Sequence, residues 1–214
     1  SQGAGSNSNN TAVGRSAMSD LTSGGNNTCI GMGSGKDIST GNENVAVGGE
    51  TCGYASSNPL TGTGNTVMGY QAGRVMEAAS NSNVLVGSAA GYRITTADEN
   101  VLIGNSAGSY ISTDNPTTAV GYEALKALTS GAACIGVGYQ ALLAHTTGAN
   151  QIAIGHGAMD ATGNAGASAN NIMIGTDAGG GTWGSTASDH NIGIGNYAMR
   201  DALNGANYNI AIGT

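Results

Sequence analysis

The stretch TTAVGYEAL, residues 117–125, contains the unit that decides the fold. Close copies stand at residues 10–14 as NTAVG and at residues 137–142 as VGYQAL. The glycine of this unit recurs along the whole chain, at Gly14, Gly31, Gly48, Gly69, Gly87, Gly104, Gly121, Gly138, Gly155, Gly175, Gly195 and Gly213. The successive gaps are 17, 17, 21, 18, 17, 17, 17, 17, 20, 20 and 18 residues. A nearly fixed period of this length predicts a solenoid of stacked, similar units.

The positions around this repeat glycine carry the same residue types in successive copies. The residue before it is Val, Ile or Met, and the third residue before it is Thr, Val or Ile. The position between these two often holds Ala or Gly. The third residue after the glycine is mostly Ala, and the seventh is apolar in most of the first seven copies. Alternation with a period of two predicts that each copy begins with a short strand and continues into a second, inward-facing leg.

Seventeen residues are enough for two short legs and two turns, but too few for a βαβ unit. We therefore expect an all-β fold, a parallel β-roll or β-solenoid of about twelve coils over residues 10–214, after a connecting segment at residues 1–9. Residues 122–128 are too few for a stable independent helix. Glycine suits the bend after each strand, as at Gly14, Gly31, Gly48, Gly121, Gly138 and Gly155.

The fourth residue before the repeat glycine is Asn in nine of the twelve copies, for example Asn10, Asn100 and Asn209. Asparagines stacked at one position predict a ladder of side-chain amides along the solenoid. Successive side chains of a strand point to opposite faces, so the β-branched residues share one face and Ala or Gly the other. We expect the Ala and Gly face to lie outside the roll and to admit another backbone. Several copies of the chain, most simply a homotrimer around a fibre axis, would cover it.

Composition and charge exclude several classes of protein. The chain has 214 residues with 38 Gly, and only 9% of the residues are charged. A net charge of −7 with six Lys and Arg argues against a nucleic-acid partner. No apolar run approaches the length of a membrane span, so we expect no membrane insertion. The three cysteines (Cys29, Cys52 and Cys134) fit neither a disulfide framework nor a zinc pattern, and we interpret them as buried small residues.

No residue pattern indicates catalysis, a cofactor or a metal site. The glycine-rich residues 31–36 and 193–198 fall on the repeat positions and lack the strand–loop–helix unit that a nucleotide site needs. The histidines have no paired-ligand spacing, and no calcium loop is present. Charged residues recur at neighbouring repeat positions and are interpreted as solvated surface charge: Asp20 and Asp37 at one, Lys36, Arg74, Lys126 and Arg200 at the other. Tyr70, Tyr122 and Tyr139 share a repeat position and are interpreted as structural.

Three insertions interrupt the period, at residues 51–64, 164–170 and 179–190. Insertions in a solenoid form loops on one face, which is often the binding face. Exposed aromatic side chains in such loops stack on sugars or anchor a protein partner. Trp183, Tyr54, Asn58 and His190 are therefore the candidate ligand-binding residues. A competing interpretation places Trp183, the single tryptophan, over the apolar flank of the roll.

The copies at residues 10–14, 118–125 and 137–142 resemble the NTAVGYQAL-type repeats of phage tail fibres and related bacterial surface proteins. They are also similar to the shorter head repeats of trimeric autotransporter adhesins. The resemblance covers residues 10–214, with departures at Thr117, Cys134, Gln151 and the insertions. It implies a trimeric, left-handed parallel β-roll in an extracellular fibre, on a virion tail or a bacterial cell surface. Such a fibre would bind a cell-surface glycan or outer-surface protein and would not be an enzyme.

Other functions stay open at this point. A purely structural shaft would carry the same repeats, with its binding tip elsewhere. A polysaccharide depolymerase built on a β-solenoid would need clustered carboxylates on one face, and the sequence does not show them. An ice-binding solenoid would need a recurring flat Thr-x-Thr array, which is also missing.

Overall fold

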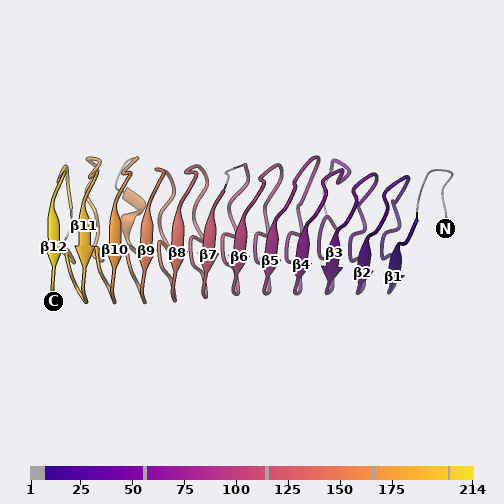
Figure 1. Cartoon of the computed structure of the whole chain (residues 1–214), viewed down its shortest axis with the longest axis horizontal. Helices are drawn as coiled ribbons and strands as arrows, with labels where there is room; N and C mark the ends of the chain where they lie inside the picture. The colour runs from indigo at the N-terminus through magenta and orange to yellow at the C-terminus, as the bar shows by residue number, and fades with distance from the viewer. Residues whose placement is uncertain (1–7, 55–56, 114–115, 165–166, 202) are drawn as a thin grey trace.

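The computed structural model describes residues 8–54, 57–113, 116–164, 167–201 and 203–214. It consists of twelve three-residue strands in one parallel sheet whose spatial order is the chain order (Figure 1). The strands are β1 (Thr11–Val13), β2 (Thr28–Ile30), β3 (Val45–Val47), β4 (Thr66–Met68), β5 (Val84–Val86), β6 (Val101–Ile103), β7 (Thr118–Val120), β8 (Ile135–Val137), β9 (Ile152–Ile154), β10 (Ile172–Ile174), β11 (Ile192–Ile194) and β12 (Ile210–Ile212). The only helix among the described residues is the short 3₁₀ helix η1 (Thr162–Asn164). The predicted all-β solenoid is thus confirmed, with about eleven turns joining the twelve strands.

Each strand pairs with the next one in register, so every repeat position stacks on itself. Val101 lies beside Thr118, and Ile103 lies beside Val120. The register holds even across the first insertion, where Val45 pairs with Thr66. The extra residues leave the coil and return to it, because Leu60 forms a parallel bridge to Ile38 of the preceding coil. Insertions therefore change the loops without shifting the sheet.

The middle residue of each strand points into the roll, and the two flanking residues point outward. Cys29, Ala46 and Ala119 are fully buried, whereas Val13 and Ile30 are 56% and 41% exposed. The expectation that the Ala and Gly face lies outside the roll is therefore wrong. The strand's inward side chains, which are small in most coils, pack on the second leg, whose Ala side chains are also buried.

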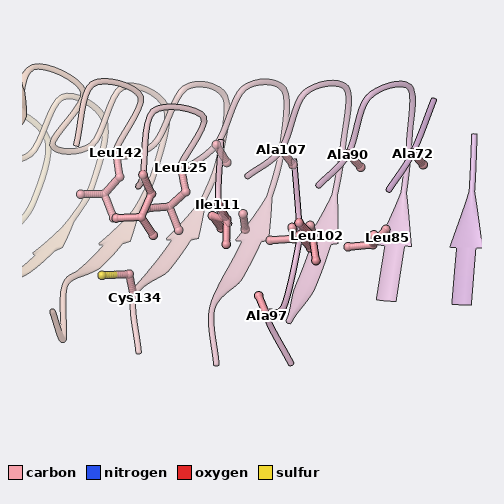
Figure 2. Packing of buried hydrophobic residues seen from close by; sticks show 14 of the residues in the cluster. Ala72, Leu85, Ala90, Ala97, Leu102, Ala107, Ile111, Leu125, Cys134 and Leu142 are labelled. Atoms are coloured by element: carbon pink, nitrogen blue, oxygen red, sulfur yellow. The ribbon is translucent and has the colours of Figure 1, made fainter. Parts of the chain in front are cut away.

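In several coils of the thin core, the strand and the second leg share one large side chain between them. Figure 2 shows Leu85 and Leu102, which come from strands, and Leu125 and Leu142, which come from the second leg. Where the strand places Leu85 or Leu102 inside, the residue six positions later is Gly91 or Gly108. A Cβ atom on Gly108 would stand only 2.8 Å from Leu102 Cδ1. In three other coils the strand residue is small and the partner is large: Ala119–Leu125, Gly136–Leu142 and Ala153–Met159. In these coils either leg provides the one large side chain at this level, whereas the coils of β2 and β3 have only Cys29 with Gly35 and Ala46 with Cys52.

The predicted asparagine ladder is confirmed. Asn27 Nδ2 donates to Asn10 Oδ1 at 3.1 Å, and the same Oδ1 accepts the backbone N–H of Asn27 at 2.8 Å. The pattern continues through Asn100 and resumes from Asn171 to Asn209. Most of these amides are buried, so the ladder satisfies polar groups that would otherwise cost free energy in the core. It is a structural device, which removes these asparagines from the candidates for recognition.

Candidate functional site

The candidate ligand-binding residues that the insertions supplied do not lie together. Trp183 is fully buried in the core, and its Nε1 donates to the Gly179 carbonyl oxygen at 2.8 Å. An enclosed indole offers no surface for a ligand, so Trp183 belongs to the packing of the roll. His190 is exposed, and its ring stacks on Tyr208 with centroids 4.9 Å apart, near the C-terminal end. It precedes β11, eight strands from the loop that follows β3.

Tyr54 and Asn58 lie beside that loop after β3, of which residues 55 and 56 are outside the described part. Asn58 is exposed and donates from Nδ2 to Glu77 Oε2 at 3.1 Å. Tyr54 is half-buried, and the Cζ atom of Arg74 stands 5.5 Å from the centroid of its ring. Tyr54 therefore lies beside a cation on the next coil and is part of a larger surface feature.

That feature is a row of alternating aromatic and cationic side chains on the leg opposite the sheet. Arg74 lies over Tyr92 as well as Tyr54, with Cζ 5.8 Å from the Tyr92 centroid, and Arg93 lies 5.8 Å from the Tyr110 centroid. We name the whole set the basic aromatic row: Tyr54, Arg74, Tyr92, Arg93, Tyr110 and Lys126. It spans the coils that begin with β3 to β7 and contains three of the six Lys and Arg residues of the chain.

The backbone ladder of the second leg sets the spacing of the row. The Tyr54 N–H donates to the Arg74 carbonyl oxygen at 2.9 Å, and the Tyr110 N–H donates to that of Lys126 at 3.2 Å. All six residues occupy the fifth or sixth place after a repeat glycine, and in the four coils whose seventh place is described they lie between buried residues at the third and seventh places. Buried neighbours on both sides in the sequence therefore hold the row on the surface.

Carboxylates neutralise two of the three cations. Arg74 Nε lies 3.0 Å from Glu50 Oε2, and Lys126 Nζ lies 2.6 Å from Glu123 Oε1. A hydrogen bond from Gln71, opposed by burial and assisted by Arg74, lowers the pKa of Glu50. Hydrogen bonds from Lys126 and then Gln140 lower the pKa of Glu123. Both acids are therefore charged at neutral pH.

Arg93 differs from these two cations, because it makes no ion pair with any of the described residues. It is exposed, and its guanidinium group is held near the Tyr110 ring. Beside it lies a surface groove of about 320 Å³. The groove is lined by Ala89, Tyr92, Arg93, Ser106, Ser109, Tyr110 and Lys126. An uncompensated cation, phenol rings and hydroxyl groups thus face one space.

A second aromatic cluster lies just after the ends of β7, β8 and β9. Tyr122 stacks on Tyr139 with centroids 5.2 Å apart, and Tyr139 stacks on His156 at 4.9 Å. These rings stand directly after repeat glycines and cover one another's faces. Their stacking agrees with the structural role expected for Tyr122 and Tyr139.

Sequence reasoning identified Tyr54 as a candidate and treated Arg74 and Lys126 as solvated charge, but it missed Tyr92, Arg93 and Tyr110. A usable signal was present. Tyr92, Arg93 and Tyr110 occupy the fifth and sixth places in two successive coils, so the repeat alignment already places them side by side. The repeat alignment alone does not show that these places lie on the outer surface of the roll.

Other chemistry has little support among the described residues. No group of three or more His, Cys, Asp or Glu side chains there could hold a metal ion. Burial raises the pKa of the Cys29 thiol to about 12, so it carries no thiolate at neutral pH. Within the same described ranges there is no helix of the length and apolarity that a membrane crossing requires.

Comparison of the chain with protein-family models, with curated proteins and with solved structures finds no match. A function for this β-solenoid is therefore inferred from its own two surface features, the outward β-branched face of the sheet and the basic aromatic row.

Proposed function

We propose that the chain is an adhesive segment of a homotrimeric extracellular fibre, on a phage tail or a bacterial surface, and that it binds a cell-surface glycan or outer-surface protein without catalysing a reaction. The observation that supports recognition is the groove beside Arg93. The roll needs apolar residues only at its inward places. Aromatic and cationic side chains concentrated at the outward places of five coils contribute little to its core, and Tyr and Arg are the residues that dominate binding surfaces.

The outward face of the sheet supports the homotrimer. Each strand presents two Thr, Val, Ile or Met side chains outward, and residues along the whole sheet are more than a third exposed, including Ile30, Met68, Ile103, Ile154 and Ile194. A contiguous apolar face of this extent marks an interaction site in a protein that stays in solution. Three such faces around an axis would bury it, and the resemblance to trimeric fibre repeats favours that number. The trimer is thus proposed on the β-branched face, in place of the Ala and Gly face that the sequence suggested.

Native mass spectrometry of the intact chain tests the assembly. We expect a trimer for the wild-type chain and a shift towards monomer for Ile103→Lys, because a buried lysine without a partner is costly. Ser130→Lys, at an exposed place on the other leg, is the matched control and should leave the mass unchanged. A folded wild-type monomer would contradict the trimer.

Whole-cell binding tests the adhesive function. Fluorescently labelled intact chain is titrated onto a panel of Gram-negative, Gram-positive and cultured epithelial cells, with competition by unlabelled chain. We expect saturable, competed binding to at least one of these surfaces. A trimer that binds none of them would instead indicate the purely structural shaft.

A further inference from the structure

The groove beside Arg93 brings together three kinds of contact that a sugar uses. Phenol rings offer apolar carbon surface, serine hydroxyls offer hydrogen bonds, and Arg93 offers a cation: the residues concerned are Tyr92, Tyr110, Ser106, Ser109 and Arg93. The volume of about 320 Å³ lies at the lower end of the roughly 300–1,000 Å³ that is usual for ligand pockets. A groove of this volume can accommodate one or two sugar rings.

The charge distribution around the groove favours an anionic ligand. The chain carries a net charge of −7, so most of its surface repels anions. At the groove Lys126 is paired with Glu123, whereas Arg93 has no carboxylate partner among the described residues. A ligand anion next to Arg93 would form the ion pair that the described residues do not supply. Because the guanidinium group is planar, it matches a carboxylate through two parallel hydrogen bonds.

We infer that this groove binds an acidic sugar, a pyranose bearing a carboxylate, and this inference rests on the proposed adhesive function. The carboxylate pairs with Arg93, the C–H surface of the ring packs on Tyr92 and Tyr110, and the ring hydroxyls reach Ser106 and Ser109. A sugar phosphate shares the anionic chemistry, but its tetrahedral group matches the arginine fork less closely than a planar carboxylate does. The intact fibre would therefore prefer surfaces rich in uronic or sialic acids over neutral glycans.

Binding of defined sugars to the intact chain tests the assignment. The probes are digalacturonate and sialyllactose, with lactose as the neutral parent and glucose 6-phosphate as the phosphate arm, measured by saturation-transfer NMR and calorimetry. We expect at least one carboxylated sugar to bind at least about tenfold more tightly than lactose, since a hydrogen bond to a charged group changes binding by that order or more. Tighter binding of the sugar phosphate would overturn the carboxylate assignment, as would failure of both carboxylated probes.

Variants locate the site. Arg93→Gln should weaken binding of the carboxylated sugar about tenfold or more, and Tyr110→Leu should weaken it, whereas Tyr110→Phe should retain it. Arg200→Gln is the matched control, because Arg200 is also exposed, with its Cζ 4.9 Å from the Tyr197 centroid, but lies outside the groove. Equal losses in Arg93→Gln and Arg200→Gln would overturn the groove as the site. Circular-dichroism melting of each variant checks that the fold is kept.

Two further outcomes separate this inference from the proposed function. If Arg93→Gln binds cells as well as wild type does, the groove assignment fails while the adhesive function stands. If poly-glutamate competes better than the acidic sugars, the ligand is an acidic protein segment and the sugar assignment fails. Loss of cell binding in Arg93→Gln alone, together with competition by the carboxylated sugar, is the result that we expect.

Discussion

Asn100 Oδ1 accepts the backbone N–H of Thr117 at 2.9 Å, and there the ladder of asparagine amides stops. Thr117 has no side-chain amide, so the ladder of amide hydrogen bonds does not continue from it to the next coil. Its buried Oγ1 is the one side-chain N or O atom among the described residues that is enclosed without a hydrogen-bond partner. A polar atom enclosed in this way lowers stability. The middle of the roll therefore contains a local defect in an otherwise regular device.

Thr117→Asn should repair this defect. The new amide would continue the ladder from Asn100, and we expect the free energy of unfolding to rise by about 1 kcal/mol, the usual net value of a hydrogen bond. Denaturant unfolding followed by circular dichroism measures the change. Thr117→Val removes the unpaired hydroxyl without adding an amide and is the matched control. Equal stability of the Asn and Val variants would show that the ladder itself adds nothing at this coil.

The compensation between Ala119 and Leu125 can be tested by exchange of the two volumes. Ala119→Leu overfills the coil and should cost about 1–3 kcal/mol, while Leu125→Gly opens a cavity and should cost about 2–5 kcal/mol. The double variant recreates the arrangement of Leu102 with Gly108 in the preceding coil. Position 125 has a φ of 51°, a value that glycine adopts readily. A double-mutant cycle should therefore show favourable coupling of about 1 kcal/mol or more, and additive losses would contradict the compensation.

His145 should make the stability of the roll depend on pH. It takes an inward place that Leu or Ile fills in other coils, with Nδ1 3.1 Å from Thr162 Oγ1 and Nε2 3.1 Å from the Gly148 carbonyl oxygen. Burial, opposed by the hydrogen bond to Gly148, lowers the pKa of His145 below its ordinary value of 6.5. The unfolded chain therefore binds this proton more readily, and the stability contributed by neutral His145 is present above pH 6.5 and lost as the pH falls below it.

The measurement compares wild type with His145→Leu by denaturant unfolding between pH 7.5 and pH 5. Wild type should lose stability with a slope from this group of at most about 1.4 kcal/mol per pH unit. His145→Leu should show a shallower dependence, because leucine suits the place and does not titrate. Parallel curves for the two proteins would contradict a neutral, buried His145.

Trp183→Ala should destabilise the C-terminal coils. The side chain is fully enclosed, and truncation of a core tryptophan costs about 3–5 kcal/mol. Because each coil contacts mainly its neighbours, the loss should appear as early unfolding of one part of the rod, visible as a second transition in hydrogen exchange or thermal melting. Binding of a ligand in the groove beside Arg93, several coils away, should persist at temperatures where the C-terminal coils are intact. An unchanged melting profile would show that the indole contributes nothing to the core.

The repeat predicted the strands, their parallel order and the amide ladder, because each depends on residue types that recur at one place. It did not predict which strand face is inside. Alternation of Val and Ala is symmetrical in that respect, and the decision depends on how near the second leg lies. The pairing of Leu102 with Gly108 indicates which face is inside. A large residue followed six positions later by a glycine implies that both positions face the same enclosed space.

The proposed recognition surface was harder to predict for a different reason. The insertions interrupt the repeat and were therefore the predicted binding loops. Trp183, the single tryptophan, lies in one of them but is buried in the core. Arg93 and Tyr110 lie on regular coils, at positions that face solvent. A charged or aromatic residue at such a position does not by itself indicate a binding site. Their significance depends on their neighbours in adjacent coils and on Arg93 having no ion pair with any residue of the described ranges.

The outward side chains of the sheet change along its length. The N-terminal strands present mainly Thr and Val, as in Thr11 and Val13, whereas from β9 onward all outward residues are Ile, as far as Ile210 and Ile212. The outward side chains are therefore larger at the C-terminal end of the sheet than at its N-terminal end, and the two ends of this face differ in shape. In the proposed trimer, a neighbouring copy that lies parallel and level sets Ile against Ile, whereas a reversed copy sets Ile against Thr and Val. A slip by one coil moves the copies by about 4.8 Å and again sets Ile against Ile from β9 onward, so the change in side-chain size distinguishes parallel from reversed copies rather than one coil from the next.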